Sequence, residues 1–298
     1  MKYCVYHKVD LDGMSSAAVV KHFIPDVIFK PYNYTDPYPF AVGELSPEDK
    51  VFFVDVTIQP YTELLRIYDL IGTNLHIMDH HKSFLESAAG LELKEKLGEN
   101  FHCSIQKAGC ELTWEFLAKK YQSELKMPRA IKLLGQYDAW RDSCLKHLSY
   151  DIPWNIVLAF QMGMKRDKFN TNDFITNFIL TGRNTDKTIE AGMVLLNYQD
   201  NQNTMLMNHA FPAVIRGFKC LMLNTGSRNS QTFVSKWNPT EYDFMVAFSM
   251  TKERKWGWSF YTDKSGFDAS SLAAQFGGGG HASAAGCQTA ELIFDEDF

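Results

Sequence analysis

The sequence predicts an α/β protein with an N-terminal, mainly parallel β-sheet carrying helices on both faces, a linker helix and a smaller C-terminal α/β domain. Three observations predict this fold. Strand-like and helical segments alternate in the first part of the chain as β-α-β-β-α-β, which is typical of an open parallel sheet. A long segment of helical spacing follows, and after Phe211 the sequence changes to short β-like runs. The length of 298 residues is enough for two domains with separate cores.

The elements of the first domain follow from hydrophobic periodicity. Strands are expected at the start of "KYCVYHKVDLDG" and in "VIFKPYNY", "KVFFVDVTI" and "NLHIMDHH". The third of these runs is almost continuously apolar up to Asp55, as expected for a strand buried on both faces. Helices are expected at "MSSAAVVKHF", with Val19, Val20 and Phe23 on its apolar face, and at "YTELLRIYDLIG", which ends near Gly72.

The middle of the chain is expected to be helical. From Ala108 to about Ser143 two helical segments are separated by a start signal at Pro128. The stretch from Asp186 to His209 has helical spacing and no proline, which indicates a linker helix. The strand-like runs after it are followed by a helix at "DASSLAAQF" and by the glycine run. The expected boundaries are 1–185 for the first domain, 186–210 for the linker helix and 211–298 for the second domain.

Composition and charge exclude several classes of protein. The formal net charge of −5 argues against a large basic surface for duplex nucleic acid, but bound divalent cations could still hold a short anionic substrate. The chain has no run of 18 apolar residues and no signal-peptide pattern at its start, so we expect a cytoplasmic protein without a membrane segment. Its six cysteines form no C-x-x-C pair, which favours reduced, buried thiols.

Acidic and imidazole side chains follow the expected strands. Ligands of parallel sheets bind at the carboxyl ends of the strands, so segments far apart in sequence would bring these groups to one edge. Carboxylates and imidazoles without cysteine favour Mn²⁺, Mg²⁺, Fe²⁺ or Zn²⁺. Six ligands suit two ions if one carboxylate bridges them, an arrangement that serves phosphoester hydrolysis. The candidate ligands are His7, Asp10, Asp12, Asp55, His80 and Asp138.

Each of these elements also has a simpler interpretation. The segment "DLDG" could be a turn or a helix cap, because an aspartate at the N-cap accepts backbone hydrogen bonds. Asp55 could cap the segment that follows it. Asp138 could pair with Arg141 on the same helix.

The histidines of "HIMDHHKS" are expected to differ in role. His76 lies on the strand and is expected to pack in the core. His80 and His81 are adjacent and are expected to point in different directions, so that only one of them binds a given ion.

The glycine run "FGGGGHASAAG" has two interpretations. It could be a flexible connection after a helix, with Gly277 as the C-cap. Its small residues could instead allow backbone N–H groups to approach a phosphate, with His281 as an additional hydrogen-bond donor. It is not a P-loop, because no Lys-Ser/Thr pair follows it.

Taken in order, "HKVDLDG", "VFFVDV", "IMDHHKS", "GQYDAW" and "FGGGGHASAAG" resemble the motifs of the DHH phosphoesterase family with its C-terminal DHH-associated domain. The resemblance spans residues 3 to 286, and the NrnB-like oligoribonuclease (nano-RNase) branch is the most similar. The family uses two divalent metal ions, typically Mn²⁺. The resemblance implies one ion held by His7, Asp10 and Asp55 and a second held by Asp12, Asp55, His80 and Asp138.

The resemblance also implies the remaining roles. His81 would donate a hydrogen bond to the scissile phosphate, and Asp79 would orient a neighbouring imidazole. The terminal phosphate or nucleotide would be bound by Gly278, Gly279, Gly280 and His281. Tyr261 stands where many relatives carry an arginine. A tyrosine stacks on a base or donates one hydrogen bond, but it cannot bind a phosphate through two parallel hydrogen bonds.

The function that the resemblance implies is a phosphodiesterase that degrades short oligoribonucleotides to nucleoside 5′-monophosphates by attack of a hydroxide held between two metal ions. The expected substrate is short single-stranded RNA or a linear or cyclic dinucleotide. The sequence does not decide whether the protein forms a homodimer. The alternatives are a RecJ-like single-strand exonuclease, a cyclic-dinucleotide phosphodiesterase and a nucleotide-binding regulatory protein without turnover. A long-strand exonuclease is disfavoured by the net negative charge, and a regulatory protein by the complete ligand set.

Overall fold

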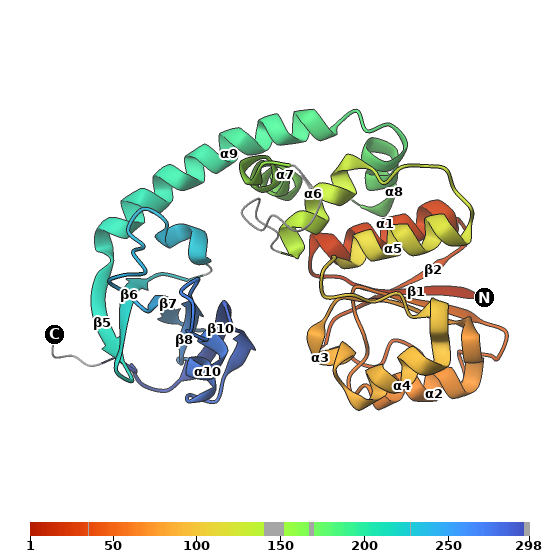
Figure 1. Ribbon diagram of the computed structural model, residues 1–298, viewed down its shortest axis with the longest axis horizontal. Helices are drawn as coiled ribbons and strands as arrows, with labels where there is room; N and C mark the ends of the chain where they lie inside the picture. Colours follow the sequence, from red (N-terminus) through yellow and green to blue (C-terminus); the bar gives the residue numbers. More distant parts are fainter. Residues whose placement is uncertain (35, 140–151, 167–169, 227, 295–298) are drawn as a thin grey trace. The chain divides into compact units, whose positions relative to one another are not determined.

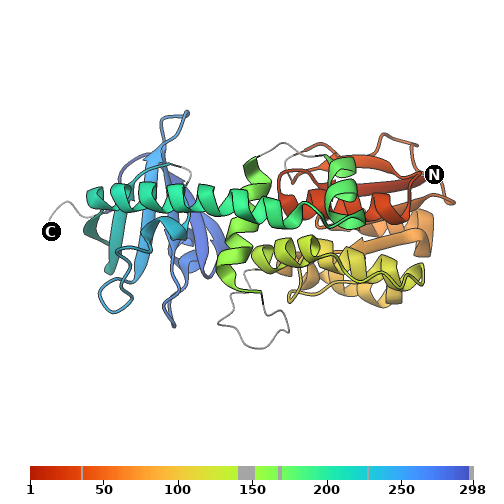
Figure 2. The ribbon, with the colours of Figure 1, turned by 90° about the horizontal axis from the view of Figure 1, so that it is seen from above.

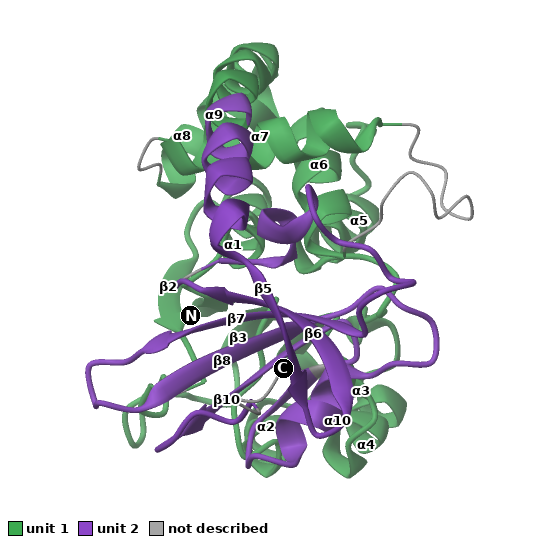
Figure 3. Ribbon diagram, turned by 90° about the vertical axis from the view of Figure 1, so that its left-hand side faces the viewer, with its two compact units in different colours: residues 1–196 green, residues 197–298 purple. Residues whose placement is uncertain are grey.

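The computed structural model describes residues 1–34, 36–139, 152–166, 170–226 and 228–294. The chain forms two compact units, Met1–Leu196 and Asn197–Phe298, which Figure 3 shows in different colours. The first contains a parallel sheet with helices, and the second contains a mixed sheet. The predicted α/β fold class is therefore confirmed.

The sheet of the first unit is entirely parallel. Its order is β2-β1-β3-β4. The strands are β1 (Lys2–His7), β2 (Ile28–Tyr32), β3 (Lys50–Val54) and β4 (Leu75–Met78). All four lie at the expected sequence runs. Because every strand points the same way, the residues that follow the strands gather at one edge.

One face of this sheet is covered by α1 (Leu11–Phe23) and α5 (Gly109–Lys120), which run side by side (Figures 1 and 2). Cys4 and Phe52 point into this layer, where they join the apolar side chains of both helices in one core cluster. The helix predicted at "MSSAAVVKHF" is thus confirmed, and it is buried along most of its length.

The opposite face is covered by α2 (Thr62–Ile71) and α4 (Ala88–Leu97), on the other side of the sheet in Figure 1. Val5, Phe53 and Ile77 point into this second layer, where they pack with buried leucines and isoleucines of the two helices. Since both faces are buried, the strands need apolar residues at every position, which explains their continuous apolar runs.

Further helices complete the first unit. They are α3 (Lys82–Leu85), α6 (Arg129–Asp138), α7 (Trp154–Arg166), α8 (Thr171–Phe174) and the one-turn segments Gly72–Asn74, Gly98–Asn100 and Ile175–Leu180. Pro128 immediately precedes α6, as the start signal predicts. The last part of the helical stretch predicted up to Ser143 lies outside the described residues.

A long helix, α9 (Thr185–Leu206), is followed by a one-turn helix at Met207–His209. A helix was expected over nearly the same residues. The two compact units divide within α9, between Leu196 and Asn197. The domain boundaries at 185/186 and 210/211 stay predictions.

The second unit is a six-stranded mixed sheet of order β5-β6-β7-β8-β10-β9. Of the strand pairs described in this second sheet, only β6–β7 is parallel. Its elements are β5 (Phe211–Ile215), β6 (Phe218–Asn224), the one-turn helix Ser230–Phe233, β7 (Phe244–Met250), β8 (Trp256–Tyr261), α10 (Ala269–Ala274), β9 (Gly279–His281) and β10 (Ala284–Thr289). Helix α10 packs on one face, and the segment around Phe233 packs on the other.

The glycine run is ordered secondary structure. Gly277 has φ +74° and ends α10: its N–H donates to Ala274, and the N–H of Gly278 donates to Ala273. This is the Schellman pattern, so the C-cap interpretation is confirmed. The residues after it form β9, which pairs antiparallel with β10 at the edge of the sheet. The interpretation of the whole run as a flexible connection is therefore wrong.

Two further observations concern membrane segments and the cysteines, of which Cys144 lies outside the described residues. None of the helices that the structure describes is long and apolar enough to cross a membrane. Cys4, Cys103, Cys110, Cys220 and Cys287 are free thiols, and all but Cys103 are buried.

Candidate metal centre

The predicted ligands of the first unit meet at the carboxyl edge of its sheet. His7 ends β1, Asp55 directly follows β3, and His80 follows β4. Two further aspartates lie at the start of α1, and another ends α6: they are Asp10, Asp12 and Asp138. Three sets of these side chains bring potential ligand atoms within 4.8 Å of one another: His7, Asp10 and Asp55; Asp12, His80 and Asp138; and Asp55, His80 and His81.

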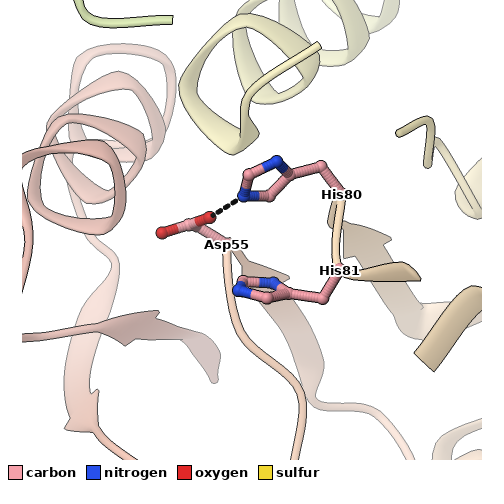
Figure 4. A group of neighbouring side chains, drawn as sticks. All are labelled: Asp55, His80 and His81. Carbon is pink, nitrogen blue, oxygen red and sulfur yellow. Dashed lines mark ion pairs between the residues drawn. The ribbon is translucent and has the colours of Figure 1, made fainter. Parts of the chain in front are cut away.

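Asp55 lies between two groups of side chains. The first group contains His7 and Asp10, and the second contains Asp12, His80 and Asp138. One carboxylate oxygen, Oδ2, is 3.7 Å from His7 Nδ1. The other, Oδ1, is 3.1 Å from His80 Nε2, a contact that Figure 4 marks with a dashed line. Its backbone has φ +57°, a left-handed conformation that costs an aspartate about 1 kcal/mol. The N–H of Asp55 donates to Met78, which ties this strained residue to the end of β4. The strand ends thus hold one buried carboxylate between two imidazoles.

The first group also uses Asp10. Asp10 Oδ2 lies 2.5 Å from His7 Nδ1, and Oδ1 accepts a hydrogen bond from the Gly13 N–H at 2.8 Å. Asp10 is therefore a helix cap and a candidate ligand at the same time. His7 Nε2 lies 3.3 Å from Asn33 Oδ1, and a proton donated there leaves the Nδ1 lone pair facing the carboxylates.

The start of α5 holds Asp12, a member of the second group, in place. Both oxygens of Asp12 accept backbone hydrogen bonds, from Gly109 at 2.7 Å and from Cys110 at 2.8 Å. A helix N-terminus stabilises a carboxylate in this position. His80 Nε2 lies 3.9 Å from Asp12 Oδ2 and 3.3 Å from Asp138 Oδ2. Arg141, the other expected partner of Asp138, lies outside the described residues.

His81 is oriented by Asp79. The Asp79 carboxylate is fully buried, and its Oδ1 lies 2.6 Å from His81 Nδ1 and accepts the backbone N–H of His80 at 2.7 Å. The rings of His80 and His81 are inclined by 64°, yet both reach the surroundings of Asp55 (Figure 4). The expected divergence does not separate them, because the chain has already left β4 and the alternation of a strand no longer applies.

His76 lies in the core, as expected. It is 2% exposed, and its ring stacks on that of Phe52 with the centroids 4.6 Å apart.

The imidazoles of the centre respond to the carboxylates around them. Burial lowers the pKa of His7, but its hydrogen bonds and charge interactions with Asp10 and Asp55 outweigh burial and raise the pKa to about 10. Burial acts on His80 in the same way, and the nearby carboxylates, Asp55 first, raise its pKa to about 10. The site therefore attracts positive charge.

The pKa values of two carboxylates are also raised, but by burial and by repulsion between like charges. Burial and then the charge of Asp55 raise the pKa of Asp12 to about 7, and burial and then the charge of Asp12 raise the pKa of Asp138 to about 7. So many acidic groups at short range repel one another when no cation lies between them.

The donor set fits divalent metal ions. Asp55 Oδ1 is buried and accepts no hydrogen bond within the described part of the chain, although His80 Nε2 lies close to it. An unsatisfied buried oxygen is costly unless a ligand completes it. Carboxylate oxygens and imidazole nitrogens are suitable ligands for divalent first-row ions. These aspartate and histidine groups are able to hold metal ions.

Sequence reasoning missed four contributors to the centre. Asn33 and Tyr34 follow β2, at the same edge as the predicted ligands, and the Tyr34 ring lies 5.7 Å from that of His7 and 5.9 Å from that of His81. Their position after a parallel strand is the signal that could have found them. Gly109 and Cys110 contribute backbone N–H groups, which leave no side-chain signal.

The predicted substrate-binding residues of the second unit lie at β8 and β9. Tyr261 is half-buried, and its hydroxyl donates a hydrogen bond to the Arg228 carbonyl at 2.8 Å. The backbone of β9 carries Gly279, Gly280 and His281, with Gly278 just before it, and the side chain of His281 lies outside what the structure describes. The role of these residues in substrate binding stays a prediction.

Comparison with known families decides the family of the first unit. Residues 2–135 match the model of the DHH family, N-terminal domain. This part of the chain is a DHH-family domain. It contains β1 to β4 and each candidate metal ligand apart from Asp138. DHH-family proteins are phosphoesterases, in agreement with the predicted enzyme class.

Individual proteins resemble the chain at low identity. An uncharacterized protein of Acanthamoeba polyphaga mimivirus is 24% identical over 312 residues, which cover 95% of this chain and 66% of that protein. The pGpG-specific phosphodiesterase PggH from Vibrio cholerae is 14% identical and has a TM-score of 0.50, with 97% of this chain and 94% of that chain covered. The DHH domain of a member of the s1p family of ribosomal proteins is 13% identical and has a TM-score of 0.55, with 97% of this chain and 82% of that chain covered. The two structures support the fold.

Proposed function

We propose that this protein is a metal-dependent phosphodiesterase that hydrolyses short oligoribonucleotides to nucleoside 5′-monophosphates. The observation that carries the proposal is the position of Asp55, one buried carboxylate with an imidazole beside each of its two oxygens. A bridging carboxylate of this kind suits a pair of metal ions, and paired ions serve in-line displacement at phosphorus.

The residues divide into two ligand sets in this proposal. His7, Asp10 and Asp55 would hold one ion, and Asp12, Asp55, His80 and Asp138 would hold the other. We propose Mn²⁺ for both positions. Bound divalent ions would lower the pKa of water toward neutrality and withdraw charge from the phosphate.

The protein's own groups would orient the substrate. Burial lowers the pKa of His81, but its hydrogen bond to Asp79 and the charges of Asp79 and Asp55 raise it above its usual value. A protonated ring donates Nδ1–H to Asp79 and keeps Nε2–H for an anionic oxygen. His81 would thus hold the scissile phosphate, and Asp79 would fix the orientation of the ring.

Short substrates fit the charge of the protein better than long ones. A long single strand needs an extended basic groove, whereas the net charge here is −5. In the second unit, the strand β9 with Gly278, Gly279, Gly280 and His281 would bind the substrate's terminal phosphate or nucleotide, and Tyr261 would contact a base. The linear dinucleotide named for the Vibrio cholerae protein is a suitable first substrate.

The test uses the purified chain with labelled di- to pentaribonucleotides, in Mn²⁺ and in EDTA, with the products resolved by chromatography. We expect Mn²⁺-dependent release of 5′-monophosphates, fastest for the shortest substrates. No release in any divalent metal would overturn the proposal.

The same assay, extended to a 20-mer and to a cyclic dinucleotide, separates the alternatives. Faster turnover of a 20-mer than of a dinucleotide would indicate a single-strand exonuclease. Opening of a cyclic dinucleotide alone would indicate a cyclic-dinucleotide phosphodiesterase. Tight nucleotide binding without turnover would indicate a regulatory protein. A cytoplasmic location and a homodimer stay predictions.

A further inference from the structure

A cavity of about 390 Å³ opens directly beside the metal centre, within the first unit. Its wall includes Asp10, Asp12 and Asp138, so a molecule inside it touches the carboxylates of the centre. The remaining wall comes from Val9 and from α1, α6 and α7. Helices α6 and α7 pack against each other (Figure 1). Small-molecule sites occupy roughly 300–1,000 Å³, so the cavity is large enough for a ligand.

A buried amide oxygen on the cavity wall has no hydrogen-bond partner within the described part of the chain. Gln161 of α7 lines the cavity and is 8% exposed, and its Oε1 atom is buried with no hydrogen-bond partner in the described part of the chain. Buried side-chain oxygens are rarely left unpaired, because the lost hydrogen bond with water is not replaced. The amide oxygen is therefore suited to accept a hydrogen bond from a bound molecule.

A cation lies on the same face of the helix. Lys165 follows Gln161 by four residues, so both side chains project from one side of α7. Lys165 is exposed, and its ammonium group lies 5.8 Å from the centre of the Tyr137 ring. Within the described chain no carboxylate forms an ion pair with it. It is thus able to bind an anionic group that approaches the acidic centre.

The rest of the wall is apolar. Leu11, Met14 and Leu134 line the cavity together with the side chain of Tyr137. An apolar wall with a few directed polar groups is typical of sites for flat, partly polar molecules such as nucleobases.

We propose that this cavity is a nucleoside subsite, which holds the nucleotide next to the scissile phosphate. Gln161 accepts a hydrogen bond from the base or the ribose, and Lys165 binds a flanking phosphate. The assignment rests on the proposed function, because that function places the scissile phosphate at the metal centre. It makes Gln161 and Lys165 determinants of substrate choice rather than of the chemical step.

The test compares two phosphodiesters in Mn²⁺. One is a diribonucleotide, and the other is bis(p-nitrophenyl) phosphate, which has the same reacting group without a nucleoside. We expect Gln161→Met and Lys165→Ala each to lower kcat/KM for the dinucleotide about tenfold, mainly through KM, and to leave the nitrophenyl ester nearly unchanged. Lys165→Arg should retain the activity. The matched control is Lys94→Ala, an exposed lysine of α4 that does not line the cavity.

Pairs of substrates that differ in one group identify which substrate group donates the hydrogen bond to Gln161. If Gln161→Met removes a preference for the ribo- over the deoxyribodinucleotide, the amide binds the ribose hydroxyl. If it removes a preference among bases, the amide binds the base edge. Either result supports the subsite. An unchanged ratio between dinucleotide and nitrophenyl ester in both Gln161→Met and Lys165→Ala would overturn it.

Failure of the proposed function would look different. In that case the wild-type protein hydrolyses neither ester, and the subsite is tested by titration calorimetry with nucleoside 5′-monophosphates in Mn²⁺. Binding that weakens about tenfold in Lys165→Ala and Gln161→Met, but not in Lys94→Ala, supports the subsite. Equal binding by all four proteins would overturn it. Lys165 is exposed, so its replacement should not disturb folding. If the Gln161 variant misfolds, the Lys165 variant alone still tests the subsite.

Discussion

The metal centre of the first unit and the glycine strand of the second unit, which is β9 with the preceding Gly278, are both predicted to bind phosphate. They are built differently. The centre gathers charged side chains from strand ends, with a strained residue and an unsatisfied oxygen at Asp55. In the glycine strand the small residues already have a structural reason: a Cβ on Gly278 would lie 2.1 Å from the Gly286 carbonyl oxygen, and one on Gly280 would lie 2.6 Å from the Ala285 Cα. Strain and unpaired polar groups therefore indicate function in the first region, whereas glycine content alone does not in the second.

The largest effect is expected at Asp55. Asn is the suitable replacement, because it tolerates the left-handed backbone of this position while removing the charge. We expect Asp55→Asn to lower kcat at least about 1,000-fold, equivalent to about 4 kcal/mol, since the residue would serve both ions. Turnover of a dinucleotide in Mn²⁺ measures the effect, and a melting curve checks the fold.

Asp69→Asn is the matched control, because Asp69 is an exposed residue of α2 away from the centre. It should retain full activity. Near-normal turnover of Asp55→Asn would show that the two-ion arrangement is wrong.

Gly109 gives the next largest effect and tests whether the backbone supports the centre. A Cβ here would lie 2.5 Å from the Cβ of Asp55, and the N–H of Gly109 holds Asp12. We expect Gly109→Ala to displace both carboxylates, lowering kcat about 100-fold and the free energy of unfolding by ~1–3 kcal/mol. Kinetics and urea unfolding measure the two quantities. A fully active variant would mean that the start of α5 moves without disturbing the centre.

The sequence predicted the fold where burial leaves a clear pattern. The apolar run that ends at Asp55 indicates a strand covered on both faces, and the same rule placed His7 and His80 at one sheet edge. Asn33 and Tyr34 follow β2 in the same way but were missed, because neither is a carboxylate or an imidazole. Residue type was therefore given more weight than position.

Long-range backbone pairing is harder to predict. Gly109 donates to Asp12 across 97 positions of sequence, and no side chain marks the donor. Gly279 and its neighbours have low intrinsic preference for strands, yet they form β9 because β10 supplies the hydrogen-bonding partner. In both cases the deciding contact is with a distant segment, which local pattern does not reveal.

Gly279 separates the two interpretations of the glycine strand. A Cβ on Gly279 meets no atom within 4 Å, in contrast to Gly278. We expect Gly278→Ala to lower the free energy of unfolding by ~1–3 kcal/mol, and Gly279→Ala to leave it nearly unchanged. If a phosphate approaches this backbone, Gly279→Ala should raise KM about tenfold with kcat unchanged, equivalent to about 1.4 kcal/mol. Unfolding curves and dinucleotide kinetics measure both. An unaltered KM would leave the glycines a purely structural role.

His76 gives the smallest effect. It distinguishes the acid response of the core from that of the metal centre, whose ligand His80 lies four residues further along the chain. Burial, assisted by the charges of Lys120 and Lys50, lowers its pKa from 6.5 to about 3. The unfolded chain thus binds a proton that the folded chain does not, so stability falls as the pH drops below about 6.5 and continues to fall toward 3. Between pH 7 and pH 5.5 this loss is about 1 kcal/mol.

Replacing His76 by Phe should remove this loss, because the new ring still stacks on Phe52 and carries no titratable nitrogen. Urea unfolding of wild type and His76→Phe at the two pH values measures the difference. His209→Gln serves as the control for the loss of a histidine at an exposed position. If His76→Phe loses as much stability as the wild type on acidification, the acid response belongs to other groups, and the carboxylates and imidazoles around Asp55 become the next to examine.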